Sequence, residues 1–339
     1  NQEIATLTIG LKDNKIIDYE QLPAISMITP CYKRRHFLPL MMCNLVNFDY
    51  PKNKITWVLY QDGEEDMFES KEQLEYVRKK LHPIKLTYYY DGKNRKSIGE
   101  KRNYCIKKLN QNKIVLMMDS DDIYMPTYPR YAVSTLRLNK MGICGSQSML
   151  FTYPFHNFVM SAIQCKEKRQ IHEGCSCIDI KHFRSTNGFL KSSQGEGTGL
   201  LDYCENRAMD LDITLCMICV DHGENTIPKE QFRQNTIDGK VCGVHKEVLK
   251  AIMTNEYPDK MNHQNQPADS GGDDESVSVV SPSSSLLINI ISFLFLFFSY
   301  SIIKFLIYAT SFLSEATSFL SSFIWSFNTI MGGLLLLFI

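Results

Sequence analysis

The sequence predicts an α/β protein with a mostly parallel sheet flanked by helices. Short apolar runs at 24–30, 55–60 and 114–118 have the length and composition of buried strands. Segments with helical spacing of apolar residues lie between them, and this alternation is typical of right-handed parallel α/β units. A chain of 339 residues is long enough to bury a sizeable core in one large or two small domains.

The first two strands both end in polar residues. The run 24–30 (AISMITP) predicts the first strand, and a basic loop at 31–35 (CYKRR) follows it. Apolar residues at helical spacing predict a helix over 37–48. The second strand, 55–60 (ITWVLY), runs directly into Asp62. Ligands bind at the carboxyl ends of strands in open parallel sheets, so the basic loop and Asp62 are expected at a ligand site.

The next segments continue the alternation. A helix is predicted over 70–81, a strand over 86–90 and a further helix over 97–109, which opens with SIGEKRN. Lys101 and Arg102 lie in the first turn of that helix, where a cation opposes the helix dipole. We interpret Arg102 as a ligand of a pyrophosphate, because guanidinium groups bind phosphate oxygens in pairs. The alternative is an exposed pair of basic side chains.

Residues 113–126 (KIVLMMDSDDIYMP) combine an apolar strand with three carboxylates, Asp119, Asp121 and Asp122. Three acids within four residues repel one another unless a positive charge lies between them, so the turn suggests a divalent ion and a phosphate-rich ligand. In an extended turn, Asp119 and Asp121 point to one side and Asp122 points elsewhere. The alternative is an Asp-rich turn that caps a helix.

Four motifs in this order, ISMITPCYKR, VLYQDG, IGEKRN and VLMMDSDDIYMP, span about residues 25–126. Together they resemble the nucleotide-binding half of glycosyltransferase family two, inverting enzymes with the Rossmann-like GT-A fold. The resemblance implies a nucleotide-diphosphate sugar as donor, with a UDP-sugar favoured and a GDP-sugar as the alternative. It further implies Mn²⁺ or Mg²⁺ as cofactor and a hydroxyl of a glycan, protein or lipid as acceptor.

The resemblance also assigns roles to residues. The positions that match the family's nucleotide-sugar-binding residues are Pro30, Tyr32, Asp62, Arg102 and Asp119. The positions that match its metal ligands are Asp119, Asp121 and Asp122. Two positions depart from the usual pattern: Lys33 replaces an asparagine, and Gln61 replaces the first of two aspartates. Neither change removes the acid that faces the base.

The acceptor side is predicted from the second half of the chain, where residues 172–183 resemble the strand beneath the donor sugar. An inverting transferase needs a carboxylate that takes the acceptor's proton. The family supplies it in a pair of acids at a helix start, and here Glu196 is the first acid while Gly197 stands at the second position. Glu196 is the predicted base, since flanking glycines allow close approach. Asp202 and Glu205 are the alternatives.

His222 follows a strand-like run at 213–220 (ITLCMICV) and is predicted as a further metal ligand or a contact of the leaving diphosphate. The alternative is a surface histidine. The pairs Cys175/Cys177 and Cys216/Cys219 have metal-like spacing, but a zinc site needs two more ligands at matching spacing. We therefore interpret these cysteines as small buried hydrophobes.

The composition changes from about residue 255, where serine, glycine and acidic residues predict a flexible linker. Two long runs without a charged residue, 286–303 and 316–339, follow it. Each is long enough to cross ~30 Å of hydrocarbon, so a C-terminal membrane anchor of one or two helices is expected. The predicted organisation is an N-terminal extension at 1–22, a GT-A domain at 23–255 with halves 23–126 and 127–255, a linker at 256–285 and the anchor at 286–339.

The balance of charges argues against a nucleic-acid partner, because 37 basic residues face 37 acidic ones. Eleven scattered cysteines suggest reduced thiols, and no leader is visible at the start of this sequence. The catalytic domain is therefore expected in the cytosol, anchored at a membrane.

The predicted activity is the inverting transfer of a sugar to an acceptor hydroxyl. Two alternatives are kept: a polyprenyl-phosphate sugar transferase and an inactive nucleotide-sugar-binding membrane protein. The turn DSDD lacks a following Gln-His-Pro-Pro-like run, which argues against the first. A sugar nucleotidyltransferase is disfavoured because the loop after the first strand, TPCYKRR, contains no glycine.

Overall fold

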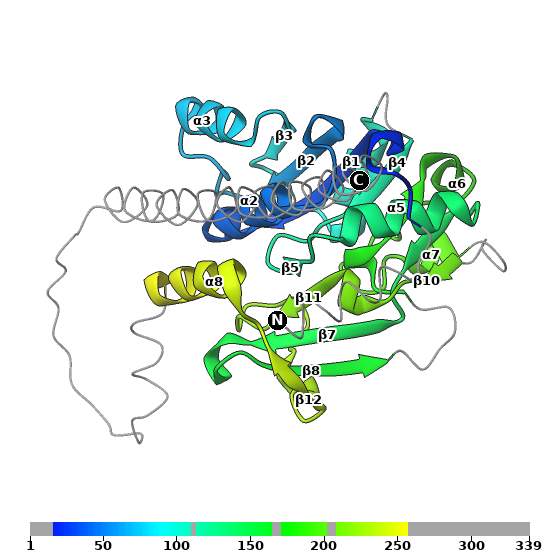
Figure 1. Cartoon of the computed structure of the whole chain (residues 1–339). Helices are drawn as coiled ribbons and strands as arrows, with labels where there is room; N and C mark the ends of the chain where they lie inside the picture. Colours follow the sequence, from blue (N-terminus) through cyan, green and yellow to red (C-terminus); the bar gives the residue numbers. More distant parts are fainter. Residues whose placement is uncertain (1–15, 110–112, 165–170, 202–207, 257–339) are drawn as a thin grey trace, which may run out of the picture. The chain divides into compact units, whose positions relative to one another are not determined.

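Figure 1 shows the computed structural model of the chain, which describes residues 16–109, 113–164, 171–201 and 208–256. All of these residues belong to the first of two compact units, Asn1–Pro267. The predicted anchor at 286–339 and nearly all of the linker at 256–285 lie outside the described residues. In the part of the chain that is described, no helix is long and apolar enough to cross a membrane. The predicted domain boundaries stay a prediction.

Four parallel strands form where the sequence has its apolar runs. They are β1 (Ile25–Tyr32), β2 (Ile55–Asp62), β3 (Lys85–Asp91) and β4 (Ile114–Met117). β1 pairs in parallel with β2 on one side and with β4 on the other, and β3 pairs with β2. All four residues of β4 are buried. Because Tyr32 is in register with Asp62, the carboxyl ends of β1 and β2 meet at one edge of the sheet.

The sheet continues beyond β4 with three short strands, β9 (Cys177–Asp179), β6 (Ile143–Gly145) and β10 (Ala208–Asp210). The complete order is β10-β6-β9-β4-β1-β2-β3. β9 is antiparallel to both β4 and β6, so the residues that precede it lie beside the carboxyl end of β4. The mixed, mostly parallel sheet agrees with the predicted Rossmann-like α/β fold.

The predicted helices are present. They are α2 (Leu38–Asn47), α3 (Lys71–Leu81) and α4 (Ile98–Lys107). A further helix, α5 (Tyr128–Leu138), was not predicted from the sequence. α4 begins with a capping box, in which the Ser97 hydroxyl accepts from the backbone of Glu100 and the Glu100 carboxylate accepts from the backbone of Ser97. Cys105 and Ile106 of α4 pack with Ile28, Val115 and other strand residues in the main core. This packing holds the start of α4 beside the carboxyl ends of β1 and β4.

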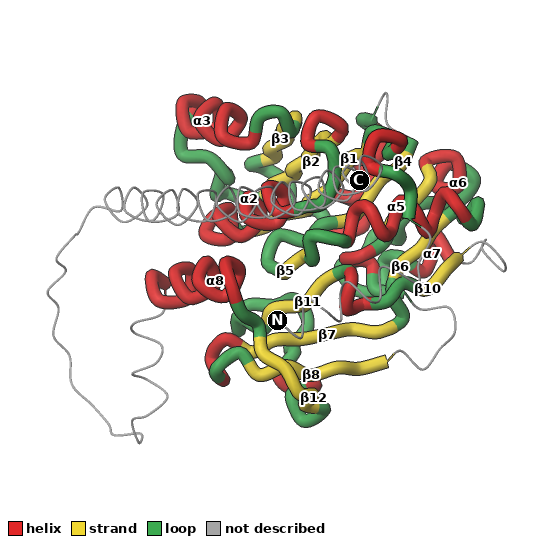
Figure 2. Tube along the Cα trace, in the orientation of Figure 1, coloured by secondary structure: helices red, strands yellow, loops and turns green. Residues whose placement is uncertain are grey.

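A second, five-stranded sheet has the order β12-β8-β7-β11-β5 (Figures 1 and 2). Its strands are β5 (Ile123–Tyr124), β7 (Ser148–Tyr153), β8 (Val159–Gln164), β11 (Met217–Val220) and β12 (Thr236–Lys240). The remaining helices are α6 (Ile180–Arg184), α7 (Thr198–Leu201) and α8 (Gly243–Glu256). Short 3₁₀ turns occur at Tyr19–Gln21, Arg35–Phe37, Lys52–Lys54, Pro154–His156, Glu173–Cys175, Ile213–Leu215 and Glu230–Phe232.

Two predicted strands are shorter than expected. Of residues 172–183, only Cys177–Asp179 is a strand, because a 3₁₀ turn precedes it and the Asp179 side chain caps α6 by accepting from the Lys181 N–H. Of residues 213–220, the first part is a 3₁₀ turn that Asp212 caps through the Thr214 N–H. The cysteines of the two metal-like pairs are buried free thiols in the core, as predicted for small hydrophobes.

Candidate active site

The edge where β1 and β2 end holds a buried ion pair. Lys101 Nζ of α4 lies 2.5 Å from Asp62 Oδ1, and the Lys96 N–H donates to Asp62 Oδ2 at 2.6 Å. Burial lowers the pKa of Lys101, and the hydrogen bond to Asp62 opposes this effect. The guanidinium of Arg95 lies 4.1 Å from the centre of the Tyr32 ring. Lys101 therefore neutralises the acid that the sequence placed near a nucleotide base.

Arg102 connects the acidic turn to the acceptor side. Its side chain is almost completely buried, with 1 % of the residue exposed. Its Nη2 donates to Asp119 Oδ1 at 2.6 Å, and its Nη1 forms a short ion pair with Glu196 Oε1. Its Nε has no hydrogen-bond partner among the described residues. Arg102 thus lies beside the predicted phosphate site, with both terminal nitrogens already bound to carboxylates.

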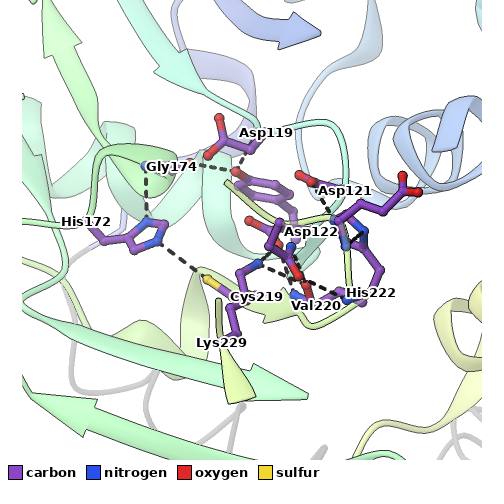
Figure 3. Close-up of polar contacts among 12 residues, drawn as sticks. Asp119, Asp121, Asp122, His172, Gly174, Cys219, Val220, His222 and Lys229 are labelled. Carbon is purple, nitrogen blue, oxygen red and sulfur yellow. Dashed lines mark hydrogen bonds and ion pairs between the residues drawn. The ribbon is translucent and has the colours of Figure 1, made fainter. Parts of the chain in front are cut away.

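Asp121 is held by Arg34 and by His222, and Figure 3 shows His222 beside it. Arg34 Nε and His222 Nε2 lie 3.2 and 2.9 Å from Asp121 Oδ2. Burial by itself raises the pKa of Asp121, but the hydrogen bond and charge of His222, with the charges of Lys229 and Arg34, bring it below its ordinary value. The structure therefore brings His222 to the acidic turn, where its ring is buried rather than on the surface.

Asp122 is directed toward β11 (Figure 3). Its Oδ1 accepts from the Val220 N–H at 2.9 Å and lies 3.3 Å from Lys229 Nζ. Burial raises the pKa of Asp122, and the Lys229 ammonium opposes this effect. Nothing in the sequence singled out Lys229, which lies 107 residues away along the chain.

The three acids of the turn are therefore each matched by a protein cation or imidazole. Arg102 pairs with Asp119, Arg34 and His222 with Asp121, and Lys229 with Asp122. The sequence argument took repulsion between the acids as a sign of a divalent ion. The structure shows that side chains from distant segments already reduce this repulsion, so repulsion alone does not require a metal.

In the described part of the predicted acceptor half, Glu196 and Glu173 are the carboxylates that line the cavity. Burial raises the pKa of Glu196, and the charge of Arg102 opposes this effect. Glu173 stands in the turn before β9, and its Oε1 accepts from the Gly197 N–H at 3.2 Å. Glu173 was not predicted from the sequence. The one indication of a role for it was its place next to Gly174, at the start of a segment predicted to lie beneath the sugar. Asp202 and Glu205 lie outside the described residues.

A cavity of about 520 Å³ joins these groups, and this volume is in the usual range for small-molecule sites. It is lined by most of the predicted residues: Pro30, Tyr32, Arg102, Asp119, Asp121, Asp122 and Glu196, together with Arg34, His172, Glu173 and Lys229. Asp62 and His222 do not line it and lie behind Lys101 and Asp121 respectively. The cavity lies at the carboxyl ends of β1 and β4, and acids from the turn and from the second half of the chain line it.

The structure is thus an α/β fold with a cavity at the carboxyl ends of its parallel strands, where open parallel sheets commonly bind small ligands. The model of the family described as Glycosyl transferase family 2 matches residues 26–179, which include the parallel strands and the acidic turn. This match supports the resemblance to glycosyltransferase family two over that part of the chain. No curated protein sequence matches the chain significantly.

Several solved structures match the chain at low identity. A mannosyltransferase from Pyrobaculum calidifontis, in complex with GDP-Man and Mn²⁺, is 16% identical with a TM-score of 0.45, and the alignment covers 68% of this chain and 66% of that one. The chain thus spans slightly less than two thirds of that relative. Residues 1–349 of S. aureus TarS are 15% identical with a TM-score of 0.44, covering 70% of this chain and 73% of that one. The same TarS fragment in complex with UDP-GlcNAc is 14% identical with a TM-score of 0.42, and the alignment covers 68% of this chain and 70% of that one.

Proposed function

We propose that this protein is a glycosyltransferase that moves a sugar from a nucleotide-diphosphate sugar to an acceptor hydroxyl with inversion, in a reaction that depends on Mn²⁺ or Mg²⁺. The observation that carries the proposal is the cavity at the ends of β1 and β4, which is lined by Asp119 and Asp121 and also by the carboxylates of Glu173 and Glu196. One set of acids suits a metal-bound diphosphate, and the other suits a hydroxyl that must lose its proton.

The donor's nucleotide would lie at the ends of β1 and β2, near Pro30 and Tyr32. Both residues line the cavity, and Tyr32 offers an aromatic ring that already carries a guanidinium on its face. Asp62 does not line the cavity but holds Lys101, which does, in place. A UDP-sugar is the favoured donor and a GDP-sugar the alternative, on the basis of the motifs alone.

The acidic turn fits a divalent ion at two of its three carboxylates. The side chains of Asp119 and Asp121 are 25% and 17% exposed, whereas that of Asp122 is only 5% exposed and is bound to Lys229. Carboxylate oxygens are the ligands that Mg²⁺ and Mn²⁺ prefer. Asp119 and Asp121 would therefore hold the ion, and His222 would orient Asp121 from behind.

In the described residues, no three side chains of histidine, cysteine, aspartate or glutamate are grouped closely enough to hold a metal ion by themselves. We therefore expect the donor's diphosphate to bind the ion together with Asp119 and Asp121. When bound, the metal would neutralise charge that develops on the leaving diphosphate, which is usually the largest electrostatic contribution in such a site.

The chain's own residues supply the remaining chemistry. Arg34 lines the cavity beside Asp121, where its charge favours an anionic donor. Arg102 fixes the positions of Asp119 and Glu196 relative to each other. A carboxylate on the acceptor side must take the proton, and Glu196, the residue predicted from the sequence, shares that side with Glu173.

The proposal is tested by turnover of donors. The purified chain is incubated with UDP-glucose, UDP-GlcNAc or GDP-mannose and Mn²⁺, with water as acceptor, and release of UDP or GDP is measured. We expect release from one donor and its loss on adding EDTA. If no donor releases its nucleotide and calorimetry detects no binding of UDP or GDP, the proposed function is wrong.

Membrane attachment and the side of the membrane are also part of the proposal. They rest on the charge-free runs at 286–303 and 316–339 and on the scattered cysteines. Protease added to sealed microsomes should digest the catalytic domain, with a first cut in the serine-rich linker. Protection of the domain from protease would place it in the lumen instead.

A further inference from the structure

Gly197 stands where a second acid is expected, and the structure shows what takes the place of its side chain. A Cβ atom built on Gly197 would lie 2.6 Å from Glu173 Cγ and 3.2 Å from Glu173 Oε1. Real Cβ atoms do not approach other atoms this closely. The backbone at Gly197 does not have a positive φ, so backbone geometry alone does not require glycine there. The space next to residue 197 is therefore filled by the carboxylate of Glu173.

Glu196 is poorly placed to accept a proton. Its carboxylate is paired with Arg102, and the two side chains are 6% and 2% exposed. Protonation of Glu196 during the reaction would leave the buried guanidinium with Asp119 as the one carboxylate that pairs with it directly among the described residues. Loss of one partner from a buried charge pair is strongly unfavourable.

Glu173 has the opposite properties. Both residues line the cavity, but Glu173 is partly exposed whereas Glu196 is buried. Within the described part of the chain, the one hydrogen bond to the carboxylate of Glu173 comes from the Gly197 N–H, which binds Oε1. Its position is fixed by the turn before β9, in which the Ser176 hydroxyl donates to the Glu173 carbonyl at 2.9 Å. Oε2 is left to accept a hydrogen bond from a bound hydroxyl.

We propose that Glu173 is the residue that takes the proton from the acceptor hydroxyl. The inference rests on the proposed function. As the acceptor oxygen forms its bond to the anomeric carbon, its proton passes to Glu173. The bond between the anomeric carbon and the diphosphate oxygen breaks, and its electron pair leaves with the nucleoside diphosphate. The carboxylate thus comes from the segment before β9 instead of from the start of α7.

The first test compares identical substitutions at the two acids. Hydrolysis of the donor that the parent uses best, among UDP-glucose, UDP-GlcNAc and GDP-mannose, is measured with water as acceptor. Glu173→Gln keeps the shape and the bond from Gly197, but cannot accept the proton. We expect kcat to fall by about 10² to 10⁴ fold, with KM for the donor and calorimetric affinity for its nucleotide unchanged. Glu196→Gln should lower kcat less than Glu173→Gln does.

The second test moves the carboxylate. Glu173→Ala empties the space beside Gly197, and Gly197→Asp in that background places a new carboxylate there. We expect Glu173→Ala/Gly197→Asp to hydrolyse the donor at least tenfold faster than Glu173→Ala. The matched control is Glu173→Ala/Gly197→Asn, which fills the same space with a side chain that cannot take a proton. Thermal unfolding of each variant verifies that it is folded.

The outcomes separate the inference from the function on which it rests. An active parent with Glu173→Gln within threefold of it, and Glu196→Gln inactive, would assign the proton to Glu196 and overturn the inference alone. Equal rates for the Asp and Asn double variants would also overturn it. A parent that neither binds UDP or GDP nor hydrolyses any donor would overturn the proposed function and this inference together.

Discussion

Replacing Arg102 by methionine tests whether this arginine organises the site from within the core. The guanidinium is buried and binds carboxylates from two segments, Asp119 after β4 and Glu196 before α7. Methionine keeps a long side chain of similar bulk and removes the charge. The two carboxylates then face each other without a cation, and that of Glu196 is almost completely buried.

The expected cost follows from this geometry. Breaking a buried ion pair by removing one partner costs about 3–5 kcal/mol, because a buried charge is left uncompensated. For a domain of roughly 150–250 residues, this corresponds to a fall in Tm of about 6–20 °C. Without Arg102, the pKa of Glu196 in the folded state rises further above its ordinary value. The folded variant then binds a proton more tightly than the unfolded chain, so its deficit in stability shrinks as the pH falls from 8 to 5.

The assay is urea unfolding of the parent, Arg102→Met, Glu196→Gln and the double variant at pH 8 and pH 5. The double variant should recover part of the loss, because it removes one of the uncompensated charges. Arg78→Met is the control, since the Arg78–Glu75 pair is exposed and contributes about 0–1 kcal/mol. A loss below about 1 kcal/mol in Arg102→Met at pH 8, or strictly additive losses in the double variant, would refute the reasoning.

Three further predictions concern the metal, the pH dependence and the packing. Asp119→Asn/Asp121→Asn should weaken Mn²⁺-dependent binding of UDP or GDP at least tenfold in calorimetry, or ~1.4 kcal/mol, because both exposed carboxylates of the turn are lost. Burial lowers the pKa of His245 from 6.5 to about 4. Above pH 6.5 this histidine therefore does not reduce the free energy of unfolding, but by pH 5 it lowers that free energy by about 1–2 kcal/mol, because the unfolded chain takes up the proton. Gly99→Ala should cost more than about 2 kcal/mol, because its Cβ would lie 1.9 Å from the Leu190 carbonyl oxygen.

Each of these has an outcome that would contradict it. Nucleotide binding that keeps its response to Mn²⁺ in the double variant would remove the metal from Asp119 and Asp121. A His245→Gln variant whose stability falls between pH 7 and 5 as steeply as that of the parent would show that other groups cause the pH dependence. Thermal unfolding of Gly99→Ala at the parent's Tm would mean that the loop at Leu190 moves freely away from α4.

The strand ends were predictable because their information is local. The apolar run at 114–118 and the acids after it are neighbours in the sequence, and a parallel sheet places strand carboxyl ends together whatever the rest of the chain does. Asp119 and Asp121 therefore appeared as site residues before the structure. The turn before β9 was not predictable in this way, because a short antiparallel strand has too few residues for a clear period.

The sequence by itself determined the α/β class, the order of the parallel strands along the chain and the acidic turn at their carboxyl ends. Only the tertiary structure decided which charges meet. Arg102 and Glu196 are 94 residues apart, and Asp121 and His222 are 101 apart. Such pairs depend on how the two sheets and the loops between them pack, and periodicity carries no information about contacts over these separations. The same packing placed Glu173 against Gly197, where the sequence showed only a missing acid.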